Sequence, residues 1–73
     1  GAAVVDGPLL MLGQGLAVAE DTAFATWTFT GGQRGGLGAA RRLRLLNGAR
    51  ATLQLSTGEE LSLEGPLDLE LRR

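Results

Sequence analysis

Apolar and polar residues alternate through the second half of this chain, and the alternation constrains the fold more than any other feature. The apolar members of the pattern are Leu43, Leu45, Ala51, Leu53, Leu55, Leu61, Leu63, Leu67, Leu69 and Leu71. In a β-strand every second side chain lies on the same face, so the pattern predicts strands with one buried and one solvated face. The connections between these strands are too short for parallel crossovers, which indicates antiparallel pairing.

Glycine and proline interrupt the chain at short intervals and so exclude long helices. Twelve glycines and two prolines divide the 73 residues, and no uninterrupted segment reaches the roughly 12–15 residues at which an isolated helix becomes marginally stable. Leucine and alanine favour helix by propensity, and a short helix over residues 39–46 is the alternative to a strand there. We therefore predict a single all-β domain over residues 1–73. Its architecture is a small antiparallel β-barrel or a two-layer β-sandwich, a meander of five to seven short strands similar in size to an SH3-like barrel.

One predicted hairpin has an Asn-Gly pair in its turn. A two-residue loop would set leucines opposite polar side chains. A three-residue loop over residues 47–49 instead pairs Leu45 with Ala51, and it also pairs Leu43 with Leu53. We therefore expect these two strands to be neighbours in one sheet.

The next two connections follow from the same rule that paired residues share a face. An odd-length loop around Gly58 pairs Leu53 with Leu63. After Gly65-Pro66 two routes preserve the pattern: the chain returns beside the same strand with Leu63 opposite Leu67, or it kinks onto a second sheet.

The first half of the chain predicts shorter and less regular strands. They cover residues 4–5, 9–12, 16–19 and 24–30. Trp27 and Phe29 share one face of the last of these, and we expect them, with Val18, to face the leucines of residues 43–71 in the core. Residues 31–38 contain five glycines and predict a mobile loop or a wide turn.

The residue types that are absent exclude most enzyme chemistry. The chain has no cysteine, histidine or lysine, which removes disulfides, thiolate and imidazole metal sites, histidine catalysis and Schiff bases. Asp21-Thr22-Ala23 resembles the Asp-Thr-Gly triplet of dimeric aspartic proteases, but alanine replaces the glycine and 73 residues are too few for the flaps. We interpret the triplet as a turn, and we predict no catalytic residue, no metal ligand and no cofactor.

Charge is segregated along the chain although the net charge is only −1. Residues 1–30, 31–50 and 51–73 carry −3, +5 and −3. The middle block forms what we term the arginine island: Arg34, Arg41, Arg42, Arg44 and Arg50. We expect a non-enzymatic module that associates with itself or docks on a larger protein through strand edges and this charged surface.

The alternative is a small β-barrel that binds nucleic acid through the arginine island. A sequence pI near 5.2 and the lack of an aromatic residue among the five arginines favour the assembly module. No stretch approaches the roughly 20 apolar residues of a membrane helix, and the N-terminal residues lack the pattern of a signal peptide. We therefore expect a soluble protein without a membrane partner, in a compartment that the sequence does not specify.

Overall fold

The computed structural model describes residues 7–72 as eight short strands. They are β1 (Leu9–Gln14), β2 (Leu16–Asp21), β3 (Thr26–Thr30), β4 (Arg34–Gly36), β5 (Ala40–Leu45), β6 (Arg50–Gln54), β7 (Glu60–Glu64) and β8 (Leu67–Glu70). The first sheet has the order β4-β1-β6-β7 and the second β3-β2-β5-β8, and each printed pair is antiparallel. The all-β sandwich is confirmed, with eight strands in place of five to seven. The strand order is not that of a meander, and the strand predicted at residues 4–5 lies outside the described residues.

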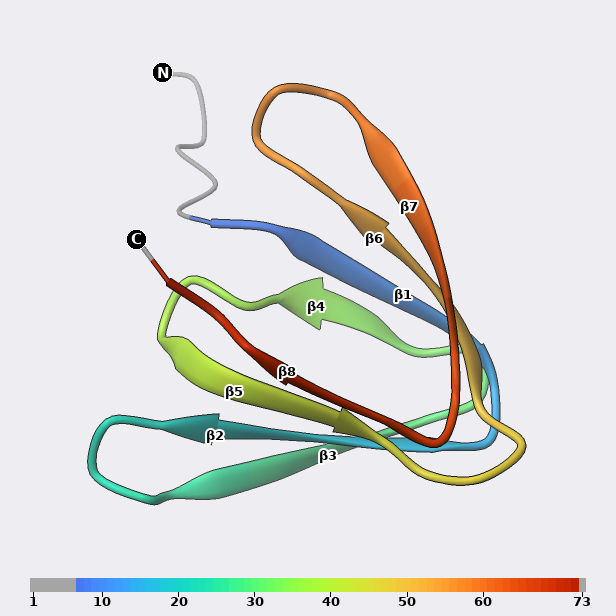
Figure 1. Ribbon diagram of the computed structural model, residues 1–73, viewed down its shortest axis with the longest axis horizontal. Coiled ribbons are helices and arrows are strands. Elements are labelled where there is room, and N and C mark those ends of the chain that lie inside the picture. The colour runs from blue at the N-terminus through green and yellow to red at the C-terminus, as the bar shows by residue number, and fades with distance from the viewer. Residues whose placement is uncertain (1–6, 73) are drawn as a thin grey trace.

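The chain passes repeatedly from one sheet to the other, mostly at one end of the molecule (Figure 1, right). We term this the closed end, and the opposite end, where the sheets diverge, the open end. Glycine permits the close packing at the closed end. Gly15 has φ +82°, and a Cβ atom there would lie 2.6 Å from Cα of Ala49, so no larger residue fits between these two connections.

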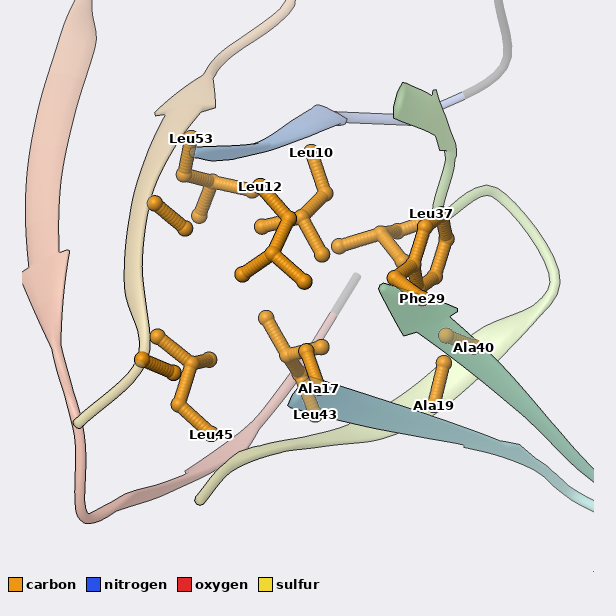
Figure 2. Close-up of a cluster of buried hydrophobic side chains, with 12 residues drawn as sticks. Leu10, Leu12, Ala17, Ala19, Phe29, Leu37, Ala40, Leu43, Leu45 and Leu53 are labelled. Atoms are coloured by element: carbon orange, nitrogen blue, oxygen red, sulfur yellow. The ribbon is translucent and has the colours of Figure 1, made fainter. Parts of the chain in front are cut away.

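The core lies between the inner faces of the two sheets (Figure 2). Its buried members are Leu10, Leu12, Ala17, Ala19, Phe29, Leu37, Ala40, Leu43, Leu45, Ala49, Ala51 and Leu53. Phe29 is 6% exposed, which confirms it as a core anchor, while Trp27 is partly buried against the cluster. The expectation for Val18 is wrong. Ala17 and Ala19 occupy the inner face of β2, so Val18 lies on the outer face opposite Arg44.

The hairpin predicted between residues 45 and 51 is wrong, because β5 and β6 belong to different sheets. Leu45 is paired with Ala17 and Leu67, whereas Ala51 is paired with Leu12 and Leu63. The apolar side chains of an alternating strand can lie beside those of a neighbour in the same sheet or face those of the other sheet. The alternation therefore does not show whether two successive strands belong to one sheet or to two.

The hairpin around Gly58 exists, with a different register. Leu53 is paired with Leu61 in place of Leu63, because residues 55–59 form the loop. The shift of two residues preserves the buried face. Of the two routes predicted after Pro66, the kink onto the second sheet is confirmed by β8.

The glycine-rich segment 31–38 is more ordered than its composition indicates. It contains β4, which pairs with β1, and it includes Leu37, which is 1% exposed. A Cβ atom on Gly35 would lie 2.9 Å from the ring of Phe29, so glycine here makes room for a core aromatic. Residues 40–45 are a strand and not a helix. The described part of the chain has no helix that could span a membrane.

Candidate interaction site

The structure divides the arginine island between the two sheets. Arg34 lies on β4 and Arg50 begins β6, both in the first sheet. The other three, Arg41, Arg42 and Arg44, lie on β5 in the second sheet. The five arginines are therefore not brought together on one strand or one sheet.

Two of these arginines are engaged by an acid of the same sheet. Arg42 donates two hydrogen bonds of 2.9 Å to the Asp68 carboxylate, and Nη2 of Arg44 lies 3.6 Å from the same group. The hydrogen bond from Arg42 holds the pKa of Asp68 below its ordinary value, and the same bond raises the pKa of Arg42. Arg42 also lies opposite Glu20 on one side and Glu70 on the other. This outer face is consequently a set of exposed cross-strand charge pairs.

A third arginine has an acidic neighbour in the first sheet. Arg50 is opposite Glu64 across β6 and β7, with Nη2 of the arginine 3.7 Å from Oε1 of the glutamate. Arg34 forms no ion pair among the residues that the structure describes. The island is thus largely balanced by neighbouring acids.

Arg41 has a different neighbour, an exposed aromatic ring. Its guanidinium lies 5.7 Å from the centroid of the Phe24 ring, a cation–π distance. The pairing of β5 with β2 shifts between Glu20 and Asp21, so Arg41 is the extra residue of a bulge, a feature that re-aims side chains. Sequence reasoning missed this contact because the two residues are distant along the chain.

Phe24 is displayed by a rigid and strained turn. Phe24 is 69% exposed, and its φ of 65° is unusual for a bulky residue. The Asp21 carboxylate accepts hydrogen bonds from the amides of Ala23, at 2.8 Å, and Ala25, at 3.0 Å. The backbone of Asp21 also bonds with Ala25 and with Phe24. The turn interpretation of Asp21-Thr22-Ala23 is confirmed, and the hydrogen bonds of the turn hold the backbone from which the Phe24 ring extends into solvent.

The divergence of the sheets leaves an apolar opening at the open end, which we term the leucine mouth. It has a volume of about 1020 Å³. Its lining includes Leu37, Leu53, Leu55 and Leu71, with Thr57 and Glu70 among the polar residues. The alternation predicted that Leu53, Leu55 and Leu71 face inward, but not that Leu55 and Leu71 would be only partly buried.

The turn between β6 and β7 at this end is acidic. Glu59 and Glu60 are exposed, and neither forms an ion pair within residues 7–72. Over the same range no cluster of acidic residues could hold a metal ion. The open end therefore combines an apolar mouth, unpaired carboxylates and, on the β2–β3 turn, an aromatic ring beside a cation.

Comparisons with protein-family models, with curated proteins and with solved structures find no match for this chain. Its function is therefore inferred from the geometry and chemistry of its own surface.

Proposed function

We propose that this chain is a non-enzymatic assembly module that associates with copies of itself. The observation that carries the proposal is the incomplete cover of the inner-face leucines. Leu55, Leu63, Leu67, Leu69 and Leu71 are only partly buried, and Leu61 is 44% exposed. Exposed apolar surface of this kind on a small domain favours association, because burying it removes apolar area from water.

The composition of the core supports the same conclusion. Five of the twelve buried residues are alanines, which bury little apolar area each. A chain of 73 residues buries a smaller fraction of its surface than a larger domain does. Contact with a second copy would supply the apolar burial that the isolated chain lacks.

The edge strands β7 and β8 provide further unsatisfied groups. The amide of Leu71 donates a hydrogen bond to the carbonyl of Arg41. Successive residues of a strand direct their backbone N–H and C=O groups to opposite sides, so those of Asp68 and Glu70 are directed away from β5, toward the free edge of β8. Exposed strand edges pair readily with other chains. The acids along these edges favour a basic partner surface and oppose pairing of two identical edges.

Sedimentation velocity over a hundredfold concentration range, at low and moderate salt, tests the proposal. We expect the sedimentation coefficient to rise with concentration. The variant Leu61→Ser should weaken association, because it removes exposed inner-face apolar area. Leu46→Ser is the matched control, since Leu46 is 38% exposed but belongs to the connection between β5 and β6, which lies at the closed end in Figure 1. A monomer at every concentration would contradict self-assembly.

A nucleic-acid surface is the second candidate, favoured by the contact between Phe24 and Arg41. A base could stack on the ring while the arginine meets a phosphate. The acids that balance Arg42, Arg44 and Arg50 weigh against it. Anisotropy of a labelled mixed single-stranded oligonucleotide separates the two candidates. Binding at low salt that falls steeply as salt rises would favour this second function, and we expect none.

A further inference from the structure

The ring of Phe24 and the leucine mouth lie at the same end of the molecule, and within residues 7–72 both are exposed to solvent. The β2–β3 turn that carries Phe24 lies at the open end in Figure 1, where the sheets diverge around the mouth. We propose that Phe24 of each copy inserts into the leucine mouth of a second copy, which closes a two-fold dimer through the open ends. This inference rests on the proposed self-association and names its anchor and its pocket.

Phe24 has the properties of a binding anchor. It is the most exposed of the large apolar side chains within the described residues. The Asp21 carboxylate and the hydrogen bonds of the turn hold its backbone in place, so little backbone freedom remains to be lost on binding. Aromatic residues and arginine, here Phe24 and Arg41, are enriched among the residues that dominate interface energies. Positive φ at a bulky residue persists where the surrounding structure enforces it, and such positions cluster at functional sites.

The leucine mouth has the properties of the complementary pocket. Its lining includes the partly buried Leu55 and Leu71 beside the buried Leu37 and Leu53. Its charged members, Glu70 and Arg72, pair with each other. Its volume of about 1020 Å³ is larger than that of a phenyl ring. The ring would cover Leu55 and Leu71, which are only partly buried, and this is the apolar burial that the proposed function requires.

The position of both features at one end determines the type of assembly. In a two-fold dimer each copy contributes the same patch, so an anchor and a pocket on one face satisfy each other reciprocally. An anchor and a pocket at opposite ends would instead produce an open chain of subunits. The geometry therefore favours a closed dimer.

Charge complementarity orients the same contact. Arg41 accompanies the Phe24 ring and forms no ion pair in the described part of the chain. Glu59 and Glu60, at the turn beside the mouth, form none either. Across the two-fold axis the cation of one copy approaches the carboxylates of the other, an arrangement that gives specificity in orientation.

The variant Phe24→Gly separates the interface from the fold. Glycine adopts φ near 65° without strain, so we expect the monomer to fold at least as well while the dimer dissociation constant rises at least tenfold. Leu46→Ala, which shortens an exposed side chain at the closed end, should leave that constant unchanged. Both constants are measured by sedimentation equilibrium.

Disulfide trapping tests the reciprocal contact directly, because the natural chain has no cysteine. A mixture of Phe24→Cys and Thr57→Cys proteins should form a mixed disulfide under mild oxidation. A mixture of Phe24→Cys and Asn47→Cys, whose second site lies at the closed end, should not. If the wild type is monomeric, the proposed self-assembly fails. If it associates but Phe24→Gly associates equally and the 24–57 disulfide does not form, only the present inference is overturned.

Discussion

At the residue scale, the closed end depends on glycines that admit close backbone contacts. A Cβ atom on Gly65 would overlap the carbonyl oxygen of Leu46, and the Gly65 amide already donates to the carbonyl of Ala49. We expect Gly65→Ala to lower the free energy of unfolding by about 1–3 kcal/mol, the usual cost of overpacking, in a urea titration. Gly36→Ala is the control, because no atom lies within 4 Å of the Cβ it would add. Equal stability of the two variants would contradict this account of the corner.

The Asp68 carboxylate gives the second prediction at this scale, a pH dependence. Hydrogen bonding from Arg42 lowers its folded-state pKa below the ordinary value of 3.8. A carboxyl group with a depressed folded pKa stabilises the fold above its unfolded pKa, and that contribution is lost as pH falls through the folded pKa. The Tm of wild type should therefore exceed that of Asp68→Asn near neutral pH, by a small amount because the pair is exposed. The difference should shrink at about pH 2.5, and a gap that is constant with pH would rule out this linkage.

At the element scale, the sequence specified strand positions better than strand partners. Period two located β5 to β8 and their inner faces, because alternate side chains of a strand lie on the same face. It did not identify the neighbours of β5, since Leu45 meets the same kind of apolar partner in either sheet. The glycines of residues 31–38 predicted a loop in place of β4. Glycine is required at residue 35 of this strand because a Cβ atom there would clash with the ring of Phe29. The candidate site escaped prediction for a similar reason: the contact between Phe24 and Arg41 and the leucine mouth both arise from packing between distant segments.

The element β4 and its continuation give a prediction that tests whether residues 31–38 are a structured part of the core. Leu37 is almost completely buried, so Leu37→Ala should cost about 2–5 kcal/mol of unfolding free energy. The exposed Leu46 is a matched control, and Leu46→Ala should change stability by less than about 0.5 kcal/mol. Both values come from urea denaturation followed by tryptophan fluorescence of Trp27. A near-neutral Leu37→Ala would mean that the segment is the mobile loop its composition indicates.

At the scale of the whole molecule, the two sheets are joined at one end and diverge at the other, and this shape links the stability of the fold to the proposed self-association. The connections of the closed end hold the sheets together, while the leucine mouth interrupts the apolar core at the open end. A chain that completes its core by association is stabilised by mass action, since a second copy binds the folded state and not the unfolded one.

The linkage predicts a concentration-dependent Tm. For a dimer that unfolds to two chains, a hundredfold increase in concentration above the dissociation constant adds about 1.4 kcal/mol per chain. In a domain of this size that corresponds to a rise on the order of 5–10 °C, measurable by differential scanning calorimetry. Phe24→Gly should show a smaller rise in Tm over the same range, because it retains the fold and dimerises more weakly. A wild-type Tm that does not move with concentration would mean that the fold is complete in a single chain, with the leucines of the mouth tolerated in water.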